Sequence, residues 1–163
     1  MIYICTVLVG NYDFLSTPNW IRKHDNVKLL CFTDQDKINK IWTKISLPKK
    51  IDHLSTFHKH KYIKLFCDKI IGKKGTYVWV DANIYLKDAT IHLINKFIKS
   101  DDDLLFVRHP SRKNPKEEYN QLISNQRFKN SEKKVNILKK KFDNYSNLDR
   151  TYEYSDLIEA NFF

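Results

Sequence analysis

Short apolar runs alternate with segments of helical spacing along this chain, a pattern that predicts an α/β fold. The apolar runs are rich in aliphatic, β-branched and aromatic residues, which are typical of buried strands. They lie over residues 2–9, 27–34, 41–47, 76–81 and 104–107. The alternation favours a mostly parallel sheet flanked by helices.

Two helices are expected before residue 100. The first covers 55–71, with Tyr62, Leu65, Phe66 and Ile70 on one face and Gly72 as the C-terminal stop. The second is expected to be capped by Asp88 and to place a stripe of isoleucines on the sheet. Its members are Ile91, Ile94 and Ile98.

Two more helices are expected towards the C-terminus. Asn114-Pro115-Lys116-Glu117 has the order of an N-cap, a proline at N1 and a glutamate at N3, so a helix begins there. A break near Asn130-Ser131 separates it from a helix over 132–142. The last residues, 160–163, turn apolar and have the pattern of a strand that begins but does not continue.

Several expected strands end in polar residues. These strand ends are Gly10 to Asp13, Thr33-Asp34, Asp81 to Asn83 and Arg108-His109. In a mostly parallel sheet such ends lie along one edge, and that edge is where α/β proteins bind ligands.

The chain of 163 residues can bury one core, and we expect a single domain over 1–163. Its three cysteines, Cys5, Cys31 and Cys67, lie far apart in apolar runs, which predicts reduced core thiols. The first residues are typical of a strand and lack the basic segment of a signal peptide. No apolar stretch approaches the roughly 20 residues that span a bilayer. These observations predict a cytoplasmic location.

The net charge of +10 comes mostly from lysine. Such a charge is compatible with nucleic acid, an anionic membrane surface in peripheral contact, or a phosphorylated ligand as partner. An AT-rich coding sequence, with lysine as the default surface residue, explains the same composition. Because the lysines are spread along the chain and not clustered with stacking aromatic residues, nucleic acid is disfavoured.

Asp81-Ala82-Asn83 follows an apolar strand and has two interpretations. The carboxylate of Asp81 and the amide oxygen of Asn83 could hold a divalent metal on a diphosphate, since such ions take oxygen ligands. Both residue types are also common in turns. The tripeptide alone does not separate the two interpretations.

Other polar residues carry similar alternatives. His109 could act as a base or metal ligand and Arg112 could clamp a phosphate, or both could be ordinary surface residues. Glu117 and Glu118 could supply a general base, but a capping role at the start of the helix explains them better. Asp34 could accept a hydrogen bond from a ribose or cap the turn after its strand.

Lys61 and Lys64 lie one turn apart on an expected helix and could face a diphosphate or solvent. The chain contains no P-loop, no GxGxxG and no serine nucleophile elbow. His58 and His60 are two residues apart, a spacing that suits neither a helical metal pair nor a zinc finger. These absences disfavour P-loop phosphoryl transfer, Rossmann redox chemistry and serine hydrolysis.

Six fragments stand in order along nearly the whole chain. They are Gly10-Asn11-Tyr12-Asp13, Phe32-Thr33-Asp34, Trp42-Thr43-Lys44-Ile45, Lys61 with Lys64, Trp79-Val80-Asp81-Ala82-Asn83, and His109 with Arg112, Glu117 and Glu118. This series resembles the glycosyltransferase-like domain family named after plant mucilage-biosynthesis and pollen-tube turgor proteins, which also has bacterial and viral members.

The resemblance implies a GT-A-like fold, a three-layer α/β sandwich that binds a nucleotide-diphosphate sugar. It implies that Asp81 and Asn83 form a weakened Asp-x-Asp motif that holds a divalent metal, Mn²⁺ or Mg²⁺, on the donor diphosphate. It implies catalytic roles for Glu117 and His109. The residues that it places against the donor are Gly10, Tyr12, Asp13, Thr33, Asp34, Lys61, Lys64 and Arg112.

The resulting hypothesis is a metal-dependent glycosyltransferase that moves a sugar from a UDP- or GDP-linked donor to a hydroxyl group of a glycan, protein or lipid. The alternative is a non-catalytic module that binds a nucleotide sugar or glycan. A lipid hydrolase and a basic nucleic-acid-binding protein are less favoured. Members of the family usually continue with a further strand and an Arg-Asp-Gln segment. Two interpretations follow: the domain is truncated at Phe163, or it is a minimal natural version, and in either case the donor half could be intact while part of the acceptor site is absent.

Overall fold

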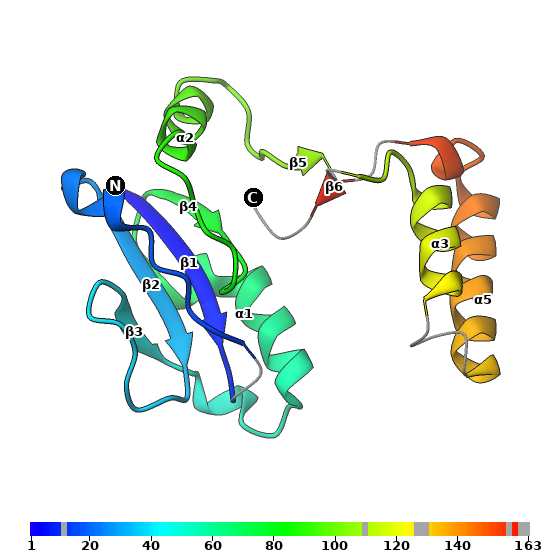
Figure 1. Cartoon of the computed structure of the whole chain (residues 1–163), viewed down its shortest axis with the longest axis horizontal. Coiled ribbons are helices and arrows are strands. Elements are labelled where there is room, and N and C mark those ends of the chain that lie inside the picture. The colour runs from blue at the N-terminus through cyan, green and yellow to red at the C-terminus, as the bar shows by residue number, and fades with distance from the viewer. Residues whose placement is uncertain (11–12, 109–110, 126–130, 156–157, 160–163) are drawn as a thin grey trace. The chain divides into compact units, whose positions relative to one another are not determined.

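A computed structural model describes residues 1–10, 13–108, 111–125, 131–155 and 158–159 of the chain. Their contacts form two compact units, Met1–Leu105 and Phe106–Ala160, and each is described by itself (Figure 1). The expectation of a single domain over 1–163 stays a prediction.

The first unit is built on a four-stranded sheet. Its strands are β1 (Ile2–Leu8), β2 (Val27–Thr33), β3 (Thr43–Ser46) and β4 (Thr76–Trp79). They stand in the order β3-β2-β1-β4, and every neighbouring pair is parallel (Figure 1). In this register Ile2 of β1 lies opposite both Val27 and Thr76. The expected α/β class with a parallel sheet is therefore confirmed for this unit.

Alternate side chains of β1 enter two separate hydrophobic clusters, one on each face of the sheet. Ile2 and Ile4 join the cluster that contains residues of α2 (Thr90–Ile98) and of the 3-10 helix η1 (Asn19–Lys23). Tyr3 and Cys5 join the cluster that contains residues of α1 (Thr56–Ile71) and of a second 3-10 helix, η2 (Lys49–Ile51). Helices thus flank the sheet on both faces, which explains why β1 is buried along its whole length and β2 at every position except Lys28.

Helix α1 has the bounds that the sequence predicts. The Ser55 side chain accepts a hydrogen bond from the backbone N–H of His58, and Gly72 ends the helix with a left-handed φ of 63°. The predicted apolar face is partly wrong, because Leu65 is 67% exposed. Ile63 and Cys67 are buried instead, one helical turn apart.

Helix α2 also differs in detail from the expectation. Asp88 does not cap it: the N-cap position is Ala89, which makes no side-chain capping bond. The Asp88 carboxylate lies 4.0 Å from Nε2 of His24 instead. Ile91 and Ile94 are buried as expected, whereas Ile98 at the last turn is half exposed.

The second unit begins with a short antiparallel pair, β5 (Val107–Arg108) and β6 (Ile158–Glu159). The expected buried strand over 104–107 is wrong, since Leu104 is 59% exposed and β5 is only two residues long. A run of apolar letters does not specify a strand when no neighbouring strand pairs with it.

The described part of the second unit also contains helices. They are α3 (Pro115–Ser124), α5 (Glu132–Leu148) and the 3-10 helix η3 (Tyr152–Tyr154). Phe142 of α5 stacks on Tyr119 of α3 with ring centroids 4.5 Å apart, and its ring lies 5.9 Å from that of Tyr152. No residue of α5 is fully buried, so aromatic contacts hold this unit together in place of a closed core.

All three cysteines are buried thiols of the first unit, which confirms their assignment to the core. Among the described residues, no helix combines the length and the apolar character needed to span a bilayer. The expected strand start over 160–163 lies outside the described residues.

Candidate functional site at the carboxyl edge of the sheet

The strand order creates a topological switch point. From β1 the chain continues to β2 and β3, which lie on one side of β1 within the sheet. Strand β4 then pairs with the other side of β1. In open parallel sheets the crevice outside the carboxyl ends of two such strands is the usual ligand site. Three of the predicted polar strand ends, those after β1, β2 and β4, share this edge. The fourth, at Arg108, is wrong because β5 belongs to a separate sheet.

Hydrogen bonds join the loops after β1 and β2. The backbone N–H of Gly10 donates to both carboxylate oxygens of Asp34, at 2.9 and 3.2 Å. The side-chain amide Nε2 of Gln35 donates to the carbonyl oxygen of Gly10 at 2.8 Å. Gly10 has a left-handed φ of 66°, which a side chain would strain. Gly10 and Asp34 therefore shape the edge, and a ribose would have to share Asp34 with the Gly10 amide.

The loop after β1 also touches the turn after β4. The Ser16 N–H donates to the Ala82 carbonyl at 2.8 Å, and Asp13 accepts from the N–H of Phe14 at 2.9 Å. Thr33 is almost fully buried, and its hydroxyl accepts from the backbone N–H of Gln35 at 3.0 Å. Its contact with the donor stays a prediction. Tyr12, predicted to contact the donor, lies outside the described residues.

Asp81 begins a turn and also makes side-chain contacts. Its carbonyl accepts from the Ile84 N–H at 3.0 Å, which confirms the turn interpretation of this segment. Its Oδ1 accepts from the Trp79 indole N–H at 2.9 Å and lies 3.6 Å from Nζ of Lys64. Asn83 is exposed within the turn. Asp81 is thus oriented by contacts with a strand residue and a helix residue.

Helix α1 carries two lysines with different surroundings. The Lys64 side chain is only 13% exposed, and its ammonium lies 5.6 Å from the centre of the Trp79 ring. Lys61 is exposed, and its ammonium lies 5.5 Å from the Phe57 ring on the same helix. The structure therefore brings Lys64, and not Lys61, to Asp81.

His60 lies one helical turn before Lys64 and belongs to the same group. Burial lowers the pKa of His60, while the carboxylates of Asp81, Asp13 and Asp34 act in the opposite direction. Residues from three strand ends are thus within electrostatic reach of one imidazole. Sequence reasoning considered His60 only as a partner of His58 and missed this role. Its spacing of four from Lys64 was the available signal.

The residues at this edge do not fit the expected metal site. A divalent ion on Oδ1 of Asp81 would meet the Lys64 ammonium, which already compensates that carboxylate. Within the described part of the chain, no three His, Cys, Asp or Glu side chains converge on one point. Asn83 brings no charge to offset this. The metal-ligand roles of Asp81 and Asn83 stay a prediction that the local geometry does not favour.

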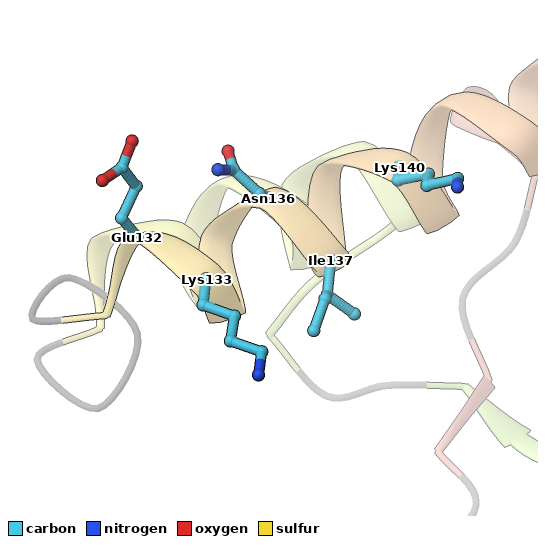
Figure 2. Close-up of a pocket in the computed structure, with 5 residues that line it drawn as sticks. All are labelled: Glu132, Lys133, Asn136, Ile137 and Lys140. Carbon is cyan, nitrogen blue, oxygen red and sulfur yellow. The ribbon is translucent and has the colours of Figure 1, made fainter.

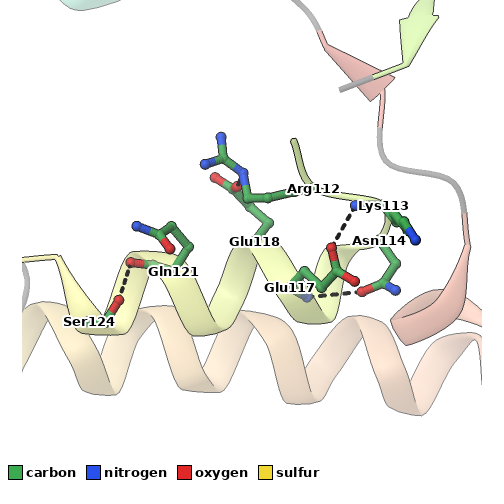
Figure 3. A network of polar contacts seen from close by, with 7 residues as sticks. All are labelled: Arg112, Lys113, Asn114, Glu117, Glu118, Gln121 and Ser124. Atoms are coloured by element: carbon green, nitrogen blue, oxygen red, sulfur yellow. Dashed lines mark hydrogen bonds and ion pairs between the residues drawn. The ribbon is translucent and has the colours of Figure 1, made fainter. Parts of the chain in front are cut away.

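Three further predicted site residues belong to the second unit, namely His109, Arg112 and Glu117. Asn114 accepts from the N–H of Glu117 at 2.9 Å, and the Glu117 carboxylate accepts from the N–H of Lys113 at 2.8 Å (Figure 3). Arg112 forms an ion pair with Glu118. The expected capping role of Glu117 is confirmed, whereas its catalytic role and the donor contact of Arg112 stay predictions. His109 lies outside the described residues.

A concave surface also runs along α5 and is lined by Glu132, Lys133, Asn136, Ile137 and Lys140 (Figure 2). All five residues come from one helix, so no other described element forms a wall. Ligand sites are normally enclosed by several elements and bury most of the ligand. The carboxyl edge of the sheet is therefore the stronger candidate.

A comparison with protein-family models gives no match for this chain. Comparisons with curated proteins and with solved structures give none either. The assignment of the candidate site is therefore based on the distances and hydrogen bonds of this structure alone.

Proposed function

We propose that the carboxyl edge of β1 and β4 binds the diphosphate of a nucleotide, and that the protein is a glycosyltransferase of GT-A type using a nucleotide-sugar donor. The observation that carries this proposal is the switch point between β1 and β4, where the Lys64 ammonium lies 3.6 Å from Asp81 and the charges of Asp81, Asp13 and Asp34 act on His60. A parallel sheet that presents charged groups at this point suits a nucleotide better than an apolar ligand.

The groups at the edge divide into two chemical roles. Lys64 and His60 can donate to phosphate oxygens, and a protonated lysine stabilises the negative charge that develops on a leaving diphosphate. Asp13 and Asp34, from the loops after β1 and β2, can accept from nucleoside hydroxyl groups in addition to their backbone bonds. Together they provide for a nucleoside diphosphate, the part common to all nucleotide-sugar donors.

A second candidate is a binding module without transferase activity. One observation favours it: the carboxylate of Glu117, the predicted catalytic base, accepts a hydrogen bond from the Lys113 backbone as part of a helix cap. A capping carboxylate is held by the protein backbone and is therefore less suited to take a proton from an acceptor. In this case the protein binds the donor and releases it unchanged.

The test is calorimetric titration of the full chain with UDP, GDP and their glucose conjugates, followed by an assay for nucleotide release in the presence of a glycan panel. We expect binding of at least one nucleoside diphosphate. Donor-dependent release of UDP or GDP supports the transferase, and binding without release supports the module.

Asp34→Ala is the matched variant for the site, because it removes both acceptors from the Gly10 amide. Asp36→Ala, an exposed neighbour, is the control. Nucleotide affinity should fall only in the Asp34 variant. If no nucleoside diphosphate binds the wild-type protein, the proposed function is wrong.

A further inference from the structure

Asp81 and Trp79 both contact the Lys64 ammonium at the switch point. Asp81 lies 3.6 Å away, and the face of the Trp79 indole lies below it at 5.6 Å from the ring centre. The same indole donates its N–H to Asp81. Trp79 of β4 and Asp81, which follows this strand, thus position the Lys64 ammonium of α1.

This position has the properties that a diphosphate requires. The side chain of Lys64 is 13% exposed, so its charge is screened less than that of a surface lysine. An ammonium has three donors. Its distance from Asp81 is longer than the 2.7–2.9 Å, approximately, of a strong charge-assisted hydrogen bond. A phosphate oxygen at hydrogen-bond distance would contact this ammonium more strongly than Asp81 does at 3.6 Å.

Each carboxylate described at this edge accepts a hydrogen bond from a protein group. Asp34 accepts from the Gly10 amide, Asp13 from the Phe14 amide and Asp81 from the Trp79 indole. A divalent ion held by the protein would need several such oxygens directed at one point. The cation present at this edge is instead the ammonium group of Lys64.

We propose that this site binds its nucleoside diphosphate without a divalent metal, with Lys64 as the cation that contacts the diphosphate and Asp81 as the residue that positions Lys64. This inference rests on the proposed function and replaces the expected metal ion at the diphosphate with the Lys64 ammonium. The negative charge of the diphosphate is neutralised by the Lys64 ammonium, and Asp81 and Asn83 do not have to act as a pair of metal ligands.

The first test uses the unmodified protein and titrates UDP and GDP in EDTA, then in Mn²⁺ and in Mg²⁺. We expect the Kd for the better nucleotide to agree within about twofold in all three conditions, since no metal contributes to the contact. Binding that disappears in EDTA and returns with Mn²⁺ overturns the inference but leaves the proposed function in place. If neither nucleotide binds in any condition, both fail.

The second test compares two lysines of the same helix. Lys64→Met keeps the apolar stem over Trp79 and removes the charge, and we expect its affinity for the nucleotide to fall by about tenfold or more. Lys69→Met is the control and should change the Kd by less than about twofold, because Lys69 is exposed on the same helix and its ammonium lies 5.4 Å from the Phe66 ring. Circular dichroism establishes that both variants are folded. Equal losses in the two variants overturn the assignment of Lys64.

The third test addresses Asp81, which acts through Lys64 in this proposal. Asp81→Asn keeps the size of the side chain and removes its charge. We expect it to change the Kd in the wild-type background and to have less than about a twofold effect in the Lys64→Met background, because interacting residues are not additive. An undiminished effect in that background overturns the positioning role. So does a Mn²⁺ dependence that Asp81→Asn abolishes.

Discussion

Polar side chains in the first unit join segments that are far apart in the sequence, whereas those around α3 act mainly within one turn. Asp34 accepts from Gly10, and Asp81 meets Lys64 of α1. In the second unit Asn114 and Glu117 bond to backbone groups three and four residues away. Long-range polar contacts at a strand edge require a packed sheet beneath them, and local caps do not.

The difference extends to the cores. The central strands β1 and β2 of the first unit are covered on both faces, and Phe32 of β2 has no exposed surface. In the second unit α5 has no fully buried residue and contacts its neighbours through aromatic rings. A site that needs fixed geometry is better supported by the first arrangement, because closely packed side chains leave a charged group few alternative positions. We therefore expect the two units to respond differently to mutation.

The largest effect is expected from Phe32→Ala, which empties a buried position of the sheet. The free energy of unfolding of the first unit should fall by about 3–5 kcal/mol. Reactivity of the three buried thiols towards a thiol reagent in urea measures this, because all three lie in the first unit. Phe57→Ala, at a 65% exposed position, should cost less than about 1 kcal/mol. Equal costs would contradict the described core.

A smaller and more local effect is expected from Phe142→Ala. The substitution removes the ring that contacts Tyr119 and Tyr152, and should destabilise the second unit by about 1–3 kcal/mol. Hydrogen exchange should accelerate in α3 and α5 and stay unchanged in β1. Leu148→Ala, at an 83% exposed position, is the matched control in α5. Faster exchange in β1 by the same factor would show that the two units unfold together. It would contradict the expectation that they respond differently to mutation.

The helix caps should give effects of about 1 kcal/mol in each unit. Asn114→Ala should cost more than Ser55→Ala, because the Asn114 bond is 2.9 Å long and the Ser55 bond 3.4 Å. Hydrogen exchange in the first turns of α3 and α1 measures the two costs. Asp88→Ala should leave exchange in α2 unchanged, since Asp88 does not cap that helix. A loss of protection there would restore the sequence-based prediction.

The smallest effect concerns the pKa of His60. The Asp81 charge raises this pKa against the larger influence of burial, so Asp81→Asn should lower it further. Because burial places the folded pKa below the unfolded value of 6.5, the stability linked to neutral His60 is present above that value. This stability is lost as the pH falls through the folded pKa. Titration of the histidine ring signals by NMR measures the shift, with Asp88→Asn as control. An unchanged or higher pKa would remove Asp81 from the group.

Local patterns predicted much of the secondary structure. The strands β1, β2 and β3 and the helices α1 and α3 lie where apolar runs, caps and turn residues place them, since these signals act within a few residues. Asn114 with Glu117 is such a case, because both partners of the cap lie in one turn. The strand over 104–107 failed for the converse reason: a strand needs a partner, and the sequence does not show one.

The sequence by itself determined that polar residues follow apolar strands at Gly10, Asp34 and Asp81. Only the tertiary structure decided that these strand ends are neighbours, because strand order depends on how the helices connect and pack. It also decided that Lys64 and not Lys61 meets Asp81. That choice follows from the rotation of α1 on the sheet, which buries Ile63 and Cys67 and exposes Leu65. Helical spacing alone allowed more than one rotation, and the packing of the core selected one.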